Sequence, residues 1–299
     1  MLKRYLPLLF VVVVVLATAI VFLLLRDSRQ PTEAPEVEPE TSRAGSDGVP
    51  EYRVESEQEY ELALESMGTS TEEIEAWARS RGFPPATYTN TPGTPLQRSY
   101  RREKVATLLG LAQGGDHWAM QFLAAKIAPD QPLEAVRWYR QAVVHGSAHA
   151  AFKLGSLYRD VAVWLQTDSG GRDDVVAIAE QEDPLAYTAL AWLLVAEYDA
   201  GLPPGSMSST LTRFHEADDE GILESCRRAA RFLADVSAER EALGIQIAQR
   251  RPPLAIELPP EETVGYCPPE IFPRVDYSGC QTVRVFGDAG SVAGHRCPE

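Results

Sequence analysis

Few residues in this chain have both the type and the spacing that metal binding or catalysis requires. His145 and His149 are four positions apart, as two metal ligands on one helical face would be. Gly146 lies between them and predicts a helix end, so the pair would not share one continuous helix. We therefore predict that both histidines are cap and loop residues. His117 and His215 have no companion ligands nearby in the sequence.

The four cysteines allow either thiol chemistry or disulfides. His295 and Arg296 directly precede Cys297, and basic neighbours of this kind lower the pKa of a reactive thiol. Cys267 and Cys280 lack the closely spaced partners of a zinc site. An even number of cysteines favours disulfides if the domain lies outside the cytosol.

The last two cysteines are placed symmetrically about a predicted turn. Residues 280–297 form two strand-like stretches around Gly287–Gly290, which predicts a β-hairpin. That register puts Cys280 opposite Cys297, close enough for a disulfide. Cys226 and Cys267 remain as a second pair, which would attach the tail to the preceding helix.

No other motif points to an active site. Gly170-Gly171 and Gly287–Gly290 lack the strand–loop–helix context of a phosphate-binding loop. Asp218–Glu220 and Asp173-Asp174 have the character of helix N-terminal charges. We predict no catalytic, cofactor-binding or metal-binding residue, no cofactor, and a binding module that is not an enzyme. The set Trp118, Trp138, Tyr139 and Tyr158 is predicted to be core that packs between helices.

Composition restricts the class of partner. The net charge is −15 over 299 residues. An acidic domain repels nucleic acid and anionic membrane surfaces, so we exclude nucleic-acid binding. The same charge favours a basic protein or peptide as partner.

The N-terminus has the features of a membrane anchor. Residues 5–25 carry no charge, and about 20 apolar residues span a bilayer. We predict an uncleaved transmembrane segment over residues 1–27, single-pass in a bacterial inner membrane, with the bulk of the chain in the periplasm. The alternative is a signal peptide cleaved after Ala17–Ala19. Residues 28–50, rich in proline and glutamate, predict an unfolded linker.

The centre of the chain repeats itself. A glycine, an alanine and a leucine recur at a fixed spacing, which is typical of a helical solenoid. The matching residues are Gly115, Ala119 and Leu123, then Gly146, Ala150 and Leu154. Start and stop signals accompany them: a capping box at Ser70 and Glu73, a cap at Asp116, and Pro132 at a helix start. Further helices are predicted over 51–67, 101–113 and 220–243.

These residues resemble the Sel-like repeat, a member of the tetratricopeptide superfamily. The match is close over Leu133–Ala142, Gly146 and Ala150–Tyr158, and Leu109–Ala124 and Ala189–Ala196 are similar to parts of the same unit. Residues 159–183 depart from it as an insertion. The register after it is open, because Ala186 and Leu190 also match; we favour the alignment containing a tryptophan. The repeat signature is Gly115, Ala119, Leu123, Ala135, Trp138, Tyr139, Ala142, Gly146, Ala150, Leu154, Gly155, Tyr158, Ala189, Trp192 and Ala196.

The resemblance implies an all-α fold, a short right-handed solenoid of αα-hairpins over residues 51–250 with its clearest repeats in 101–201. A proline-rich, cysteine-containing tail with a β-hairpin follows over 251–299. The resemblance implies adaptor or scaffold work, so we expect a membrane-anchored envelope protein that binds another protein or a peptide. The alternative is an envelope enzyme or redox-active protein that uses the tail.

Overall fold

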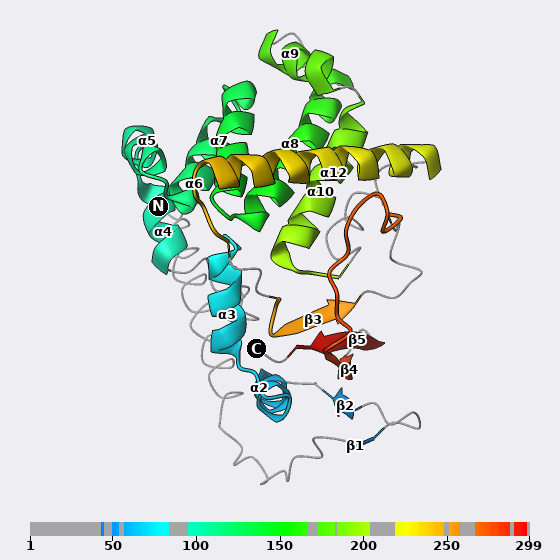
Figure 1. The fold of residues 1–299 in the computed structure, drawn as a ribbon. Helices are drawn as coiled ribbons and strands as arrows, with labels where there is room; N and C mark the ends of the chain where they lie inside the picture. The colour runs from blue at the N-terminus through cyan, green and yellow to red at the C-terminus, as the bar shows by residue number, and fades with distance from the viewer. Residues whose placement is uncertain are drawn as a thin grey trace, which may run out of the picture. The chain divides into compact units, whose positions relative to one another are not determined.

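The structure, a computed structural model, is mostly helical and carries one small sheet (Figure 1). It describes residues 43–44, 50–53, 57–83, 95–166, 173–182, 184–203, 219–247, 251–257, 267–287 and 290–297. All of these belong to one compact unit, Thr41–Glu299. The predicted anchor, its cleavage alternative and residues 28–42 of the linker lie outside these ranges. Within them, no helix has the length and apolar character needed to cross a membrane.

The helices follow one another along the chain and pack mainly on their sequence neighbours. α5 packs on α6, α6 on α7, α7 on α8, α8 on α10, and α10 on α12. α12 also contacts α7, across which it lies (Figure 1). The bounds are α2 Glu57–Ser66, α3 Thr71–Ser80, α4 Pro95–Arg102, α5 Val105–Gln113, α6 His117–Ile127, α7 Pro132–Val144, α8 Ala148–Gln166, α9 Asp173–Glu182, α10 Leu185–Ala200 and α12 Asp219–Ala242.

The predicted start and stop signals are confirmed. The Ser70 side chain accepts a hydrogen bond from the backbone N–H of Glu73, 3.2 Å away, at the start of α3. Asp116 caps α6 by accepting from two backbone N–H groups, and Pro132 begins α7. Gly146 follows α7 with a φ of 95°, a left-handed conformation that glycine adopts without strain.

Small residues let the central helices approach closely. Gly155 of α8 faces the backbone of α10, where an added Cβ would lie 2.8 Å from the Ala189 carbonyl oxygen. Ala150 and Ala189 are fully buried in the same core. Glycine and alanine at these positions therefore bring α8 and α10 together without a steric conflict.

Two predicted helix boundaries were wrong, and the insertion predicted over 159–183 contains helix. α8 continues to Gln166 and α9 covers Asp173–Glu182; buried Val161 and Ile178 join both helices to the core. The helix predicted over 101–113 is two helices, α4 and α5, and α4 begins at Pro95, six residues before the predicted start. The helix predicted over 51–67 begins only at Glu57, because the preceding residues form a strand.

The sheet contains more than the predicted hairpin. Gln281 pairs with Arg296 and Gly287 with Gly290, which is the predicted register. The strands are β1 Arg43–Ala44, β2 Pro50–Arg53, β3 Leu254–Glu257, β4 Gln281–Gly287 and β5 Gly290–Arg296, in the order β1-β2-β4-β5-β3. β2 runs parallel to β4, and the other pairs are antiparallel. The end of the predicted linker and the tail thus share one sheet.

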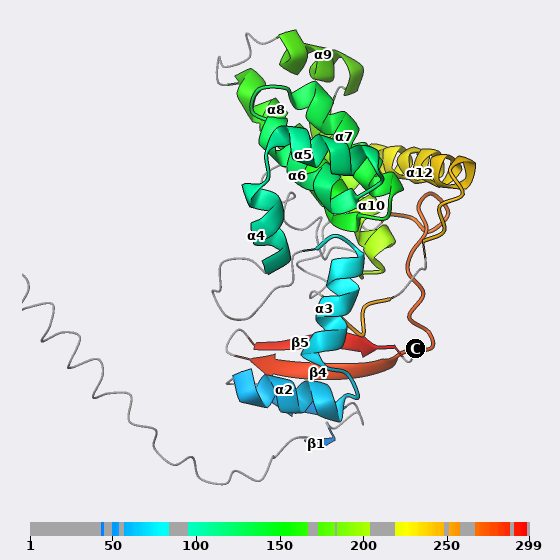
Figure 2. The ribbon, with the colours of Figure 1, turned by 90° about the vertical axis from the view of Figure 1, so that its left-hand side faces the viewer.

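A second, smaller core lies between α2 and this sheet. It contains Ala63 and Leu64 of α2, Met67 in the turn after α2, and Val283 of β4, all at most 3% exposed. Figure 2 shows α2 running alongside β4. The sheet is therefore covered by a helix from the other end of the unit.

All four cysteines are paired, in the two combinations favoured by the sequence. Cys226 of α12 is joined to Cys267, with 5.6 Å between their Cα atoms, and both are buried. Cys280 is joined to Cys297 across the hairpin, with 4.2 Å between their Cα atoms. Two disulfides are typical of an oxidising, extracytoplasmic compartment.

Candidate ligand-binding site between α6 and α8

The repeat signature builds the scaffold and leaves ligand contacts to other residues, with the exception of Tyr139. Its glycines Gly115 and Gly146 adopt positive φ angles in turns, and Gly155 lies where α8 meets α10. Trp138 is partly buried against the core. The remaining members are at most 5% exposed: Ala119, Leu123, Ala135, Tyr139, Ala142, Ala150, Leu154, Tyr158, Ala189, Trp192 and Ala196.

The histidines lie in different elements. His117 begins α6, His145 is the C-cap of α7 as predicted, and His149 lies in α8 and not in a loop or cap. No group of histidine, cysteine or acidic side chains in the described ranges is arranged to hold a metal ion. Asp219 and Glu220 lie in the first turn of α12, as predicted for helix N-terminal charges. Residues 170–171, His215 and Asp218 lie outside the described residues.

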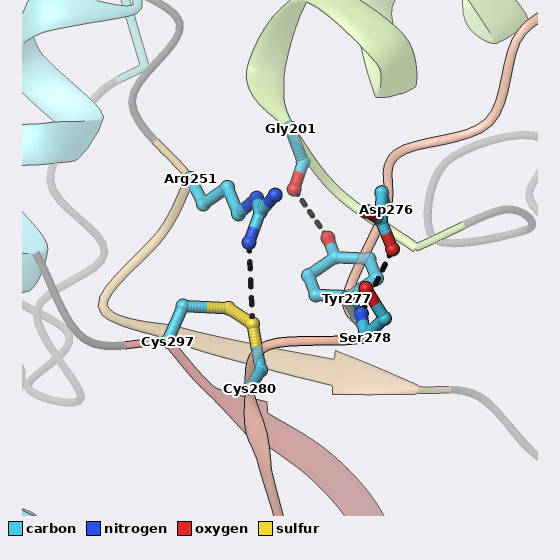
Figure 3. The surroundings of a disulfide bond; sticks show 7 residues. All are labelled: Gly201, Arg251, Asp276, Tyr277, Ser278, Cys280 and Cys297. Atoms are coloured by element: carbon cyan, nitrogen blue, oxygen red, sulfur yellow. Dashed lines mark hydrogen bonds between the residues drawn. A yellow bond between two sulfur atoms is a disulfide. The ribbon is translucent and has the colours of Figure 1, made fainter.

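The tail's thiol candidate is part of the hairpin disulfide (Figure 3). The Arg251 guanidinium donates from Nη1 to the Cys280 sulfur, 3.6 Å away. Tyr277 stacks on His295 with ring centroids 4.7 Å apart, and its hydroxyl donates to the Gly201 carbonyl at the end of α10. These contacts attach the hairpin to the helical part.

A pocket opens between α6 and α8, with a volume of about 350 Å³. This α6–α8 pocket lies within the size range of small-molecule and peptide side-chain sites. The end of α4 and one residue of α7 complete its lining. The lining residues are Arg101, Trp118, Gln121, Phe122, Ala125, Lys126, Tyr139, His149 and Lys153.

Helical periodicity brings these side chains together. Trp118, Phe122 and Lys126 are four residues apart along α6 and so lie on one face. His149 and Lys153 have the same spacing on α8. The pocket therefore has one aromatic wall and one polar wall, each set by a single helix.

The aromatic wall is held by a stacked series of rings. Phe122 stacks on Tyr100 of α4, with centroids 5.6 Å apart, and on Trp118, at 6.4 Å. The Tyr100 hydroxyl donates to Asp116, the cap of α6, at 2.5 Å. Burial, this hydrogen bond and the Asp116 charge raise the pKa of Tyr100 to about 12, so the hydroxyl keeps its proton. The wall is thus fixed before any ligand arrives.

The polar wall centres on a neutral histidine. His149 Nδ1 lies 2.8 Å from the side-chain amide oxygen Oε1 of Gln121, which accepts a hydrogen bond from the Nδ1–H of the neutral ring. Phe83 and Phe152 lie against the ring, with centroids 5.3 and 6.0 Å away. Burial, with a smaller contribution from the Lys153 charge, lowers the pKa of His149 to about 3. The imidazole is therefore uncharged at neutral pH.

Three cations surround the pocket: Arg101, Lys126 and Lys153. The Lys126 ammonium donates to the Arg101 carbonyl oxygen at 2.9 Å. None of the three forms an ion pair with an acidic residue that the structure describes. Burial lowers the pKa of Lys153, and the positive charges of Arg101 and Arg159 lower it further, against the opposing effect of Asp160. The pocket is a local positive region in an acidic protein.

Tyr139 adds a hydrogen-bonding group to the lining. Its side chain is 5% exposed and makes no hydrogen bond with any described residue. Burial raises its pKa to about 12, so the hydroxyl remains a donor. A hydroxyl that lines the pocket and has no described protein partner is available to donate to a ligand.

Sequence reasoning missed this site for two reasons. Trp118 and Tyr139 are both predicted to be core; Tyr139 does belong to the buried core, but both residues also line the pocket. The three cations come from three separate helices and form no cluster in the sequence. The one available signal was the Trp118–Phe122–Lys126 spacing, which identifies an aromatic and basic stripe on a helix whose other faces are buried.

Because His149 is neutral when folded, stability is expected to fall as the pH drops. Its pKa is about 3 in the folded chain and about 6.5 when unfolded. Below pH 6.5 the unfolded chain gains a proton that the folded chain does not bind until about pH 3. The loss at pH 5 is about 2 kcal/mol relative to pH 7.

Urea unfolding of the wild type and of His149→Gln at pH 7 and pH 5 measures this effect. In His149→Gln, the free energy of unfolding should differ much less between pH 7 and pH 5 than it does in the wild type. Burial also lowers the pKa of His117, so a smaller difference remains. His145→Gln, at the end of α7, is the matched control and should retain the wild-type difference. A variant at position 149 with an unchanged difference contradicts the expectation.

Comparisons of the chain with protein-family models, curated proteins and solved structures found no match.

Proposed function

We propose that this protein is a membrane-anchored, extracytoplasmic binding module that holds another protein or a peptide through the α6–α8 pocket and the surface around it. The observation that carries the proposal is the pocket itself. It combines a pre-formed aromatic wall with three cations and one hydroxyl, that of Tyr139, and none of these polar groups has an acidic or hydrogen-bonding side-chain partner among the described residues. A ligand could supply the counter-charge, the hydrogen-bond acceptor and the apolar contact that these groups lack. Packing between two helices does not require such groups.

The packing supports an origin of this surface in Sel-like helical repeats. Gly115 and Gly146, at equivalent repeat positions, have φ angles of 89° and 95° in the turns before α6 and α8. The leucines that follow each are at most 2% exposed. Equivalent residues thus have equivalent environments, and α6 and α8 become the first helices of successive repeats. The pocket then lies between two first helices.

The alignment containing the tryptophan is the better account of α10. That helix packs most extensively on α8, as the second helix of a repeat packs on the first. Ala189, Trp192 and Ala196 are all at most 3% exposed. We therefore count α8 and α10 as a second repeat pair, with α9 inserted between them and α12 covering the end.

The anchor and compartment complete the proposal. Residues 5–25 have the composition of a membrane span. The two disulfides support an oxidising compartment, which for a bacterial inner-membrane protein is the periplasm. The binding unit would then face the periplasm on a tether.

The proposal is tested by filling the pocket. Ala125 is exposed and lines the pocket, so Ala125→Trp should occlude it while leaving the core unchanged. The full-length chain is purified with its bound proteins from detergent-solubilised envelopes, and each protein is quantified by mass spectrometry. Ala125→Trp should reduce the recovery of the bound partner at least about tenfold, a loss of about 1.4 kcal/mol of binding free energy.

Ala234→Trp is the matched control, since Ala234 is an exposed residue of α12 that does not line the pocket. It should retain wild-type recovery. Equal recovery of every protein by the wild type and both variants would mean that the pocket holds no protein partner.

The alternative function, a redox-active tail, has one supporting contact. After reduction, the Arg251 guanidinium beside Cys280 would favour a thiolate on that sulfur. This reading requires that Cys280–Cys297 cycles between states in the cell. Finding that pair as free thiols in a fraction of the cellular protein would favour it over a permanent structural disulfide.

A further inference from the structure

We infer that the α6–α8 pocket takes a peptide segment carrying both a carboxylate and an aromatic or apolar side chain. This inference rests on the proposed function and specifies the chemical class of the partner. It also reverses the expectation from net charge, which favours a basic partner.

The pocket lining carries three positive charges. Arg101, Lys126 and Lys153 converge on one pocket from α4, α6 and α8. Arg159, the other basic residue of α8, has an acidic neighbour in Asp160 at 2.9 Å. The three pocket cations have no such partner among the described residues. A ligand carboxylate would supply the missing counter-charge, in a partly desolvated site where a charge-assisted hydrogen bond is strongest.

The aromatic wall of the pocket favours an apolar or aromatic side chain on the ligand. Trp118 and Phe122 offer ring surface, and their stack with Tyr100 already orders them. An ordered wall loses little conformational entropy on binding. Inorganic anions or a purely acidic segment would leave this surface exposed to water. An apolar or aromatic side chain next to the carboxylate would cover it.

The hydrogen-bonding groups of the pocket favour a ligand that accepts hydrogen bonds. Tyr139 and neutral His149 line the pocket beside the cations. The hydroxyl of Tyr139 donates, and a carboxylate or a peptide carbonyl accepts. A basic side chain has only donors to offer, and it would meet three positive charges. The local groups therefore select against the basic partners that the net charge of −15 would attract from a distance.

A random heptapeptide library tests the inference with the full-length chain. Half of the library carries a free C-terminal carboxylate and half an amidated C-terminus, so side-chain and terminal carboxylates are distinguished. Bound peptides are sequenced, and the affinities of the most enriched are measured by calorimetry at two salt concentrations. Enriched peptides should contain a carboxylate within two positions of an aromatic or large apolar residue.

The variant is Arg101→Gln/Lys153→Gln. The control is Arg102→Gln/Lys104→Gln, which removes the same two charges at exposed positions outside the pocket. The pocket variant should weaken binding of the enriched peptides at least about tenfold, and the control less than about twofold. Thermal unfolding of both variants verifies that they are folded.

Enrichment of basic or uncharged peptides, no enrichment at all, or equal binding by the pocket variant and the control would each overturn the inference. The proposed function fails separately. If Ala125→Trp abolishes recovery of a partner whose binding segment contains no carboxylate, the pocket binds a protein and only its assigned chemistry is wrong.

Discussion

Replacing Arg240 with alanine is expected to lower the free energy of unfolding by about 3–5 kcal/mol. Its guanidinium forms a two-point ion pair with Asp199 of α10, at 2.6 and 3.2 Å. It also donates to the Val143 and Val144 carbonyls at the end of α7, at 2.7 and 3.1 Å. One side chain thus joins α12, α10 and α7.

The cost arises because both partners are largely buried. The Asp199 side chain is 10% exposed and that of Arg240 is 13% exposed. Removing the guanidinium leaves a desolvated carboxylate and two helix C-terminal carbonyls without their donor. Urea unfolding at pH 7 measures the loss.

Two controls separate this effect from general surface changes. Arg227→Ala, whose ion pair with Glu224 is much more exposed, should cost less than about 1 kcal/mol. Arg240→Met/Asp199→Leu removes both charges and should be more stable than Arg240→Ala by at least about 1 kcal/mol. A cost below 1 kcal/mol for Arg240→Ala would show that the contact does not hold the three helices together.

Loss of the Cys226–Cys267 disulfide, through Cys226→Ala/Cys267→Ala, is expected to cost about 4 kcal/mol, the second large effect. The bond closes a loop with a sequence separation of 41 and holds Phe272 and the tail against the helical core. Without it the unfolded chain has more freedom and the tail loses its covalent attachment to α12.

Cys280→Ala/Cys297→Ala is the matched control. Its sequence separation is 17, so the same model of chain entropy gives about 3 kcal/mol. The difference between the two double variants is therefore about 1 kcal/mol.

Alkylation of cellular protein before and after reduction, read as a mass shift, measures the oxidation state of the four cysteines. Four reactive thiols without reductant would contradict an oxidising compartment.

Local signals predicted local structure well. Ser70, Asp116, Pro132 and Gly146 act at helix ends as their chemistry requires, because capping depends on residues within one turn. The hairpin register was equally accessible, since alternation and turn position determine it. The pairing of Cys280 with Cys297 follows from that register.

Long-range pairing was not predictable in the same way. β2 pairs with β4, more than 200 residues later, and residues 51–53 by themselves resemble the helical segment that follows them. Residues 43–44 belong to a proline- and glutamate-rich segment whose composition predicts no structure. Only the partner strand makes these residues extended.

In the candidate site, too, the contacts within one helix were predictable from the sequence and the contacts between helices were not. Trp118 and Phe122 share a face of α6 because of their spacing, which the sequence shows. Arg101 of α4 and Lys153 of α8 reach the same pocket only through the tertiary arrangement of separate helices, which the sequence does not show. Net charge misleads here, because it averages over the surface, whereas a ligand responds to the few groups around its own site.

Site-specific photocross-linking in intact cells tests whether the α6–α8 pocket binds a partner. A benzoylphenylalanine replaces Trp118, so that one aromatic side chain of the pocket lining is exchanged for another, or Ala234 on α12, and covalent adducts are detected after irradiation. We expect a discrete protein or peptide adduct at position 118 that is absent at 234 and strongly reduced by Arg101→Gln/Lys153→Gln. No adduct at 118, or the same adducts at both positions, would mean that the α6–α8 pocket is not the binding surface of this protein.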